Sequence, residues 1–153
     1  VIGCAAQDVN ELLVLELLGS ATFHACEMQV LDEQMLPSRV AEKIAVQEPA
    51  AVVVSVVPRG GFDQARFLCR SIREAGYAGP IIVACFGKFK HFDRLFVKFR
   101  KAGATRMTTT FQQTQAKLVA ILGRIANDAS TNSLPAATST SSTSPRDSTV
   151  TLR

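Results

Sequence analysis

Apolar residues follow two patterns that alternate along the first 126 residues. Short continuous apolar runs indicate buried strands, whereas longer segments with apolar residues three and four positions apart indicate helices with an apolar face. The predicted strands cover residues 1–6, 22–30, 51–57, 80–86 and 104–108, and the predicted helices cover 8–18, 37–48, 62–75, 91–102 and 111–125. We expect Gly19 to end the first helix. Five strand–helix units in this order predict a three-layer α/β domain with a doubly wound, parallel, five-stranded sheet, because right-handed crossovers place helices on both faces.

The last part of the chain has a different composition. Residues 127–153 are dominated by Ser, Thr, Pro and Ala, so they have little to bury. We therefore expect one ordered domain at 1–126, followed by a disordered tail at 127–153. The chain begins with Val1, already inside an apolar run, and we interpret it as a fragment truncated at its amino end. No apolar stretch reaches the roughly 18 residues of a membrane span, because Glu11 and Glu16 interrupt the segment richest in leucine.

Segment 51–62 is the most informative part of the sequence. It predicts a buried strand that breaks at a Pro-Arg-Gly-Gly turn and restarts as a basic helix. The carboxyl end of a central strand is where ligands bind in an open α/β sheet. The two glycines could let a backbone approach a ligand while the arginine supplies a cation, or they could simply form the turn that starts the helix. The segment contains no carboxylate, histidine or cysteine before Asp63, which favours binding over catalysis. The candidate contacts are Ser55, Pro58, Arg59, Gly60 and Gly61.

Charge is unevenly distributed along the chain. The net charge is +4, but residues 1–58 hold eight acidic residues against two basic ones, and residues 59–126 hold thirteen basic residues against three acidic ones. Helical spacing places Arg66, Arg70 and Arg73 together. Such a basic half could meet phosphates, an acidic partner or an anionic membrane surface, or it could consist of solvated helix faces. Basic and aromatic residues alternate at 88–92, but without a recognised nucleic-acid module we expect no nucleic acid as a partner.

Candidate nucleophiles and metal ligands are few. The four cysteines fall in apolar segments without a Cys-x-x-Cys pair, so we expect buried free thiols rather than a metal or redox site. His24 and His91 have no neighbouring nucleophile or metal partner in the sequence. Among the phenylalanines, Phe86 and Phe89 follow a strand and are the better candidates for contact with a ligand. The sequence therefore predicts no enzyme, no catalytic residue and no metal site. The cysteines are Cys4, Cys26, Cys69 and Cys85.

Three families build five strand–helix units of this length: receiver domains, flavodoxins and cobalamin-binding domains. Phosphoryl transfer in a receiver needs an aspartate at the end of the third strand and further acids after the first, which hold magnesium. Here the third strand ends in Val56, Val57 and Pro58, and the fifth strand lacks the lysine usual in receivers. A phosphoacceptor receiver is therefore excluded. Residues 6–10 also lack the hydroxyl-rich phosphate loop of a flavodoxin.

Residues 1–126 resemble a cobalamin-binding domain. Such domains carry Asp-x-His-x-x-Gly after the first strand, Ser-x-Leu near the end of the third and Gly-Gly after the fourth. Asp8 and Ser55 match this pattern, and Phe86-Gly87 occupies the third motif. Asn10 stands where the cobalt-ligating histidine would be, and an amide is a poor substitute for imidazole. Leu13 replaces the glycine. The resemblance implies cofactor-binding positions at Asp8, Asn10, Ser55, Phe86 and Gly87, with base-off cobalamin binding lost and no cofactor retained.

A narrower resemblance links the chain to some permeases of the autoinducer-2 exporter family. It rests on Ser55, the string ARFLCRSIR at 65–73, GPIIV at 79–83 and Gly103-Ala104. These sequences are similar to the soluble carboxyl-terminal domain of those permeases. The resemblance implies a non-enzymatic regulatory or ligand-sensing domain at the cytoplasmic face of the inner membrane. Its partners would be the parent permease, an anionic membrane surface or a small or anionic ligand.

Two other functions remain open at this point. One is a working corrinoid-binding or other cofactor-binding domain that uses a mode without histidine. The other is a pseudo-receiver, a protein-interaction domain that keeps the receiver shape without its chemistry.

Overall fold

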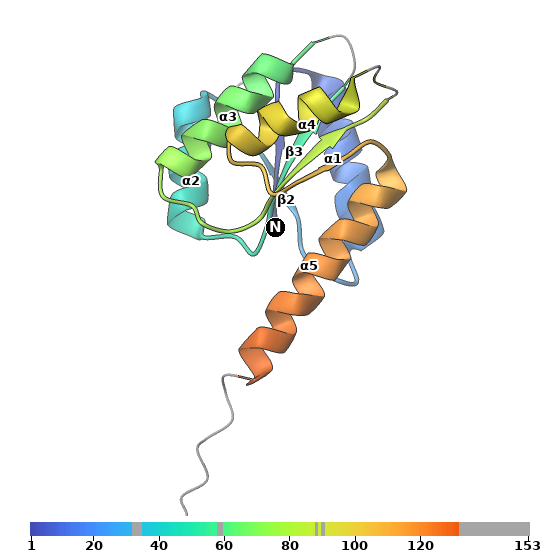
Figure 1. The fold of residues 1–153 in the computed structure, drawn as a ribbon. Helices are drawn as coiled ribbons and strands as arrows, with labels where there is room; N and C mark the ends of the chain where they lie inside the picture. The colour runs from blue at the N-terminus through green and yellow to red at the C-terminus, as the bar shows by residue number, and fades with distance from the viewer. Residues whose placement is uncertain (32–34, 58–59, 88, 90, 132–153) are drawn as a thin grey trace, which may run out of the picture.

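The computed structural model describes residues 1–31, 35–57, 60–87, 89 and 91–131. Within these residues the chain forms a parallel five-stranded sheet with the strand order β2-β1-β3-β4-β5 and five helices (Figure 1). The predicted α/β fold is therefore confirmed, in the flavodoxin-like strand order. In chain order the elements are β1 (Ile2–Ala5), α1 (Val9–Thr22), β2 (Gln29–Leu31), α2 (Pro37–Gln47), β3 (Val52–Val56), α3 (Phe62–Glu74), β4 (Ile81–Cys85), α4 (Phe92–Lys101), β5 (Arg106–Thr108) and α5 (Phe111–Thr131).

Each face of the sheet is covered by its own helices. Helices α1 and α5 pack on one face, where Leu18 and Leu118 are completely buried. Helices α2, α3 and α4 pack on the other face, through Ile44, Ile72 and Phe99 among others. The middle strand β3 is buried along its whole length, as expected for a run of β-branched residues covered on both sides. No helix in the described part of the chain is long and apolar enough to cross a membrane.

The region after the first helix differs from the prediction. Residues 22–30 were predicted to form a strand, but α1 continues to Thr22 and β2 contains only Gln29–Leu31. Gly19 does not end the helix; a Cβ atom there would lie 3.2 Å from the Cβ atom of Met28, so glycine allows the helix to pack closely against the following segment. Thr22 continues the buried face and donates a hydrogen bond from its hydroxyl to the Leu18 carbonyl, 2.7 Å away. His24 therefore lies in the turn after α1 and not on a strand.

The last helix is longer than its apolar pattern predicts. Helix α5 was predicted to end at residue 125, but it runs to Thr131 and projects beyond the sheet (Figure 1). No proline or glycine follows Gly123 within the helix, and Ala126 and Ala129 are good helix formers, so nothing in the local sequence stops it. The predicted domain boundary at residue 126 thus falls inside a helix. Residues 132–153 of the predicted tail lie outside the described residues.

Candidate functional site

A buried carboxylate occupies the carboxyl edge of the sheet. Glu11 is only 1% exposed. Its Oε2 atom accepts hydrogen bonds from the backbone nitrogens of Gln7 (2.8 Å) and Asp8 (3.1 Å), and its Oε1 atom accepts one from the backbone nitrogen of Val57 (2.9 Å). Converging backbone N–H groups of this kind form an anion-binding concavity. Here the concavity, which we call the strand-end nest, holds a carboxylate of the chain itself.

Local sequence explains how Glu11 reaches this position. Asp8 is the N-cap of α1, and it forms a capping box with Glu11. The Asp8 side chain accepts a hydrogen bond from the Glu11 backbone, and the Glu11 side chain accepts one from the Asp8 backbone. The Oδ1 atom of Asp8 also accepts a hydrogen bond from the side-chain nitrogen of Asn10, 2.8 Å away. Asp8 and Asn10 were predicted as cofactor contacts. In the structure both side chains are exposed and bonded to each other at the start of a helix.

The glycine turn packs against the same carboxylate. Gly61 is buried with φ at 75°, a conformation that favours glycine, and it begins α3. A Cβ atom at this position would lie 3.5 Å from Oε1 of Glu11 and 3.6 Å from the Cβ atom of Ala6. The predicted close approach of the backbone therefore exists, but the neighbouring group is an internal carboxylate. Gly60 is exposed, and the predicted contacts Pro58 and Arg59 lie outside the described residues.

Ser55 lies in the middle of the sheet. It pairs with Ala5 of β1 on one side and Ala84 of β4 on the other, so it has small neighbours in both adjacent strands. The side chain is completely buried, and its hydroxyl has no hydrogen-bond partner among the described residues. A buried hydroxyl without a partner costs free energy. The structure therefore places this predicted contact inside the sheet, below the strand-end nest.

The residues after β4 separate to opposite faces of the sheet. Phe86 is half-buried against the core beneath α1 and α5, and its backbone nitrogen donates to the Val56 carbonyl at 3.1 Å. Phe89 packs on the other core, where its ring meets that of Phe62 edge-on, with centroids 5.6 Å apart. Gly87 between them has φ at 146°. The two phenylalanines predicted as ligand contacts therefore do not form one aromatic surface.

Arg73 is a structural residue at the opposite, amino edge of the sheet. Its Nη1 atom donates to the carbonyls of Tyr77 and Gly79, both at 2.7 Å, and its Nε atom donates to the Gly103 carbonyl at 2.9 Å. The guanidinium also lies over the Tyr77 ring, 5.7 Å from its centroid. These contacts join the loop before β4 to the loop before β5.

The three arginines of α3 consequently do not form one row. Arg66 pairs with Asp63 at 3.1 Å, and Arg70 is exposed. Arg73, which was predicted to share a face with them, is half-buried in its hydrogen bonds to loop carbonyls. A cationic surface on this helix therefore consists of Arg70 and the partly neutralised Arg66.

Three of the four cysteines are buried thiols, as predicted. Cys4, Cys69 and Cys85 are buried, whereas Cys26 is half-buried. Burial raises the pKa of Cys69 and of Cys85 from 9.0 to about 12 and also raises the pKa of Cys4. For Cys85, the neighbouring Cys69 and the Glu11 carboxylate raise the pKa further. These thiols are therefore protonated at neutral pH and are poor nucleophiles. Among the described residues, no group of three or more His, Cys, Asp or Glu side chains could hold a metal ion.

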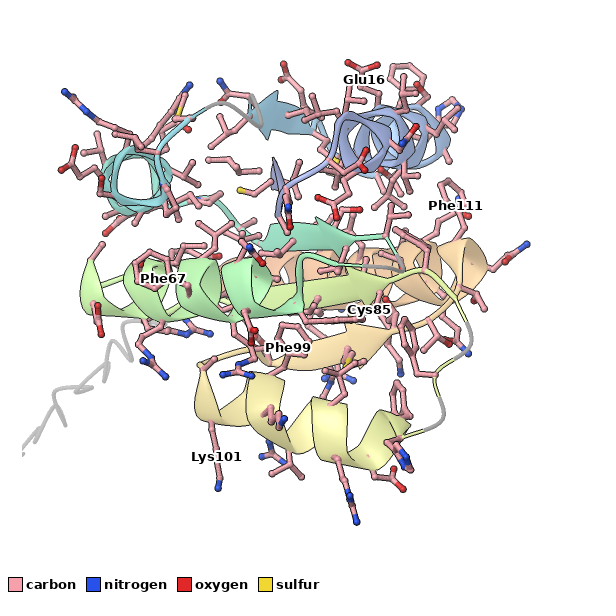
Figure 2. The ribbon with its side chains drawn as sticks, turned by 90° about the horizontal axis from the view of Figure 1, so that it is seen from above. Glu16, Phe67, Cys85, Phe99, Lys101 and Phe111 are labelled. Carbon is pink, nitrogen blue, oxygen red and sulfur yellow. The ribbon has the colours of Figure 1, made fainter. Side chains whose placement is uncertain are left out.

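A separate hollow of about 310 Å³ lies between α2 and α3, beside the ends of β1 and β2. Figure 2 shows Phe67 on the side of α3 that faces α2. The polar side chains in the wall are Asp63, which is already paired with Arg66, and Gln64. Its apolar walls include Cys4, Leu31, Val40, Phe67 and Leu68.

The comparisons identify the shape of the domain. No family model matches the sequence, and no curated protein sequence is significantly similar to it. A signal receiver domain assigned to a LuxO repressor protein from Vibrio parahaemolyticus is 11% identical, with a TM-score of 0.60 over 87% of this chain and 97% of that one. The CheY-like protein TadZ from Pseudomonas aeruginosa is 13% identical, with a TM-score of 0.59 over 80% and 92%. The BeF3-activated receiver domain of DrrB is 18% identical, with a TM-score of 0.51 over 80% and 97%.

The fold is that of receiver domains. At these identities the similarity shows the fold alone. The strand ends of this chain differ from those that phosphoryl transfer in a receiver needs: β1 ends at Ala5, β3 at Val56 and β5 at Thr108. Among the described residues, the buried carboxylate at these strand ends is that of Glu11, which enters from a helix and whose oxygens are both hydrogen-bonded. Glu11 is not among the site residues predicted from the sequence, although its Asp-x-x-Glu spacing from Asp8 is the sequence signature of a capping box.

Proposed function

We propose that this domain is a pseudo-receiver, a non-enzymatic protein-interaction module with the receiver shape. The observation that carries the proposal is the hydrogen-bonded Glu11 carboxylate in the strand-end nest. An incoming phosphate would meet a negative charge at the place where the backbone donors converge. Removing that carboxylate would leave three partly buried N–H groups without their acceptor, which costs free energy.

The same geometry argues against a resident cofactor or metal ion. Both oxygens of Glu11 already accept hydrogen bonds, and the neighbouring carboxylate of Asp8 caps α1, where its Oδ1 atom accepts hydrogen bonds from the backbone and side-chain nitrogens of Asn10. Magnesium is usually held by one or two carboxylates together with substrate phosphates. Asn10, at the position of the cobalt ligand in cobalamin-binding domains, has its side-chain nitrogen bonded to Asp8. The proposal therefore includes no cofactor and no catalytic residue.

The link to a membrane permease stays a prediction. It would place the domain at the cytoplasmic face of the inner membrane, with the permease or an anionic membrane surface as partner. The similarity to receivers bears on the fold and not on this link. Exposed basic residues on α4, such as Arg94, Lys98 and Lys101, are compatible with an acidic or anionic partner. We make no nucleic-acid partner part of the proposal.

The proposal is tested with the phosphoryl donor of receiver domains and the cofactor of cobalamin-binding domains. The chain is incubated with acetyl phosphate and Mg²⁺, and in a second sample with hydroxocobalamin, beside an active receiver domain as positive control. We expect an unchanged intact mass, no retained corrin absorbance, and unshifted amide resonances of Gln7, Asp8 and Val57. A phosphoryl adduct, a stoichiometric corrin or a saturable shift of these amides would overturn the proposal.

A further inference from the structure

Helix α1 is apolar on its outward side as well as on its inward side. Toward the sheet, Leu15 and Leu18 are buried. Away from it, Val9, Leu13 and Leu17 are 58%, 55% and 62% exposed. These three residues are four positions apart, so they lie one above the other on a single helical face. We call them the α1 stripe.

The α1 stripe differs from the outer surfaces of the helices on the opposite face of the sheet. Those helices expose one large apolar side chain each, namely Val46 on α2, Phe67 on α3 and Val97 on α4. Single exposed apolar residues are normal on protein surfaces. Figure 2 shows Lys101 of α4 pointing away from the domain, as expected for a solvated helix. A helix that is apolar all round is usually covered on all sides, so the stripe predicts a partner surface.

Neighbouring residues extend the apolar surface. Phe23, six residues after Leu17 and the C-cap of α1, is 69% exposed. Helix α5 borders the same end, because the Gln115 side chain donates to the Ala21 carbonyl at 3.0 Å. With about 200 Å² for a large apolar side chain, the α1 stripe exposes roughly 350 Å². Two stripes facing each other bury roughly 700 Å², which is the size of a weak, transient contact.

We propose that the α1 stripe binds the α1 stripe of a second copy of this chain, with the two helices antiparallel about a two-fold axis. The inference rests on the proposed interaction function and names its partner. The stripe is symmetric about Leu13, with Val9 and Leu17 one turn to either side, so a two-fold axis beside Leu13 brings apolar residues against apolar residues. An unrelated partner would not require this symmetry.

The charges on α1 fit the same arrangement. Glu16 is the one exposed charged side chain within the helix. An antiparallel pairing about Leu13 moves the two Glu16 side chains apart and brings each toward the amino-terminal half of the other helix. A parallel pairing would instead place the two carboxylates at the same height.

The test is the oligomeric state of the intact chain, measured by light scattering and sedimentation from micromolar to nearly millimolar concentration. We expect a concentration-dependent dimer. Leu13→Glu places two like charges at the two-fold axis and should weaken the dimer at least about tenfold. Val97→Glu puts the same charge at a similarly exposed aliphatic position on α4 and should leave the dimer unchanged. Far-ultraviolet circular dichroism checks that each variant is folded.

A mixing experiment makes the test specific for the axis. Leu13→Glu and Leu13→Lys chains should each be monomeric alone and should form a heterodimer when mixed, because residue 13 of one copy faces residue 13 of the other. A wild-type chain that stays monomeric throughout, or a dimer that survives Leu13→Glu, would overturn the inference. The phosphoryl and corrin tests do not depend on the oligomeric state. The pseudo-receiver proposal is therefore tested independently of the dimer.

Discussion

The Oε1 atom of Glu11 lies 2.9 Å from the backbone nitrogen of Val57, 46 positions later in the chain. This hydrogen bond joins the start of α1 to the end of β3, two elements on either side of the point where the strand order changes direction. Open α/β sheets bind ligands at that point. In this domain the contact that a ligand would make is made by a side chain of the protein.

Replacing Glu11 should therefore destabilise the fold. Glu11→Ala leaves three partly buried N–H groups without an acceptor, and we expect a loss of about 2–4 kcal/mol in the free energy of unfolding. Glu11→Gln keeps one acceptor oxygen and should lose about half as much. Urea denaturation measures both, with the exposed Glu16→Gln on the same helix as control, expected within about 0.5 kcal/mol of wild type. A Glu11→Ala variant as stable as wild type would contradict this role.

Alanine substitutions at Gly61 and at Gly60 test whether the glycine turn depends on the backbone conformation of Gly61. Gly61→Ala forces a side chain into a left-handed conformation beside Glu11, and we expect it to cost about 1–2 kcal/mol. A Cβ atom at Gly60 would meet only the Gln7 side chain, 3.7 Å away, so Gly60→Ala should be close to neutral. Thermal unfolding of the two variants gives the comparison. Equal effects would show that the turn is not specified by the φ angle of Gly61.

Arg73 should contribute more to stability than its neighbours in sequence suggest. Arg73→Ala removes three charge-assisted hydrogen bonds to loop carbonyls, and we expect a loss of about 2–4 kcal/mol. Arg73→Lys keeps the charge without the planar fork and should recover only part of that loss. The exposed Arg70→Ala on the same helix is the control. Chemical denaturation that finds Arg73→Ala and Arg70→Ala equivalent would be inconsistent with the network.

The Ser55→Ala variant tests whether the buried Ser55 hydroxyl has a hydrogen-bond partner in the centre of the sheet. Its hydroxyl is buried without a hydrogen bond among the described residues, so Ser55→Ala should be neutral or should stabilise the fold by up to about 1 kcal/mol. Denaturant titration of the variant is sufficient, and Thr114→Ala, which breaks the buried 2.7 Å contact between the Thr108 and Thr114 hydroxyls, is the destabilising control. A marked loss of stability on Ser55→Ala would reveal an unrecognised partner.

Stability should fall at alkaline pH. Below pH 9 the thiols of Cys69 and Cys85 are protonated in both the folded and the unfolded chain, so they impose no penalty. Above it the unfolded chain ionises while burial keeps the folded thiols neutral up to about pH 12, which costs about 1 kcal/mol per thiol for each pH unit. Tyr77, whose pKa burial raises from 10.0 to about 12, adds to the loss above pH 10. Unfolding curves between pH 8 and 11 check this slope.

Cys69→Ala and Cys85→Ala provide the comparison for that slope. Each variant should have a lower stability at neutral pH, because it loses packing in the core, but a shallower decline at alkaline pH. A decline that does not change in either variant would assign the alkaline effect to other groups.

Several local features could be predicted from sequence because they depend on neighbouring residues. The apolar runs marked β1, β3 and β4, the helical spacing of apolar residues within 91–102 marked α4, and the glycine turn marked the start of α3. Gly19 misled the prediction, since its role is to admit Met28 and not to end a helix. That contact forms only when the segment after α1 folds back against it.

The sequence by itself determined the α/β class, the number of strand–helix units and the missing receiver chemistry at the strand ends, because each follows from residue type and short-range spacing. Only the tertiary structure decided what the polar residues do. Glu11 became the occupant of the strand-end nest and Arg73 a link between two loops, because each has, besides its local partners, one backbone partner far along the chain, 46 and 30 positions away. It also decided which apolar residues of α1 face water, since the two sides of that helix are alike in sequence and only the position of the sheet distinguishes them.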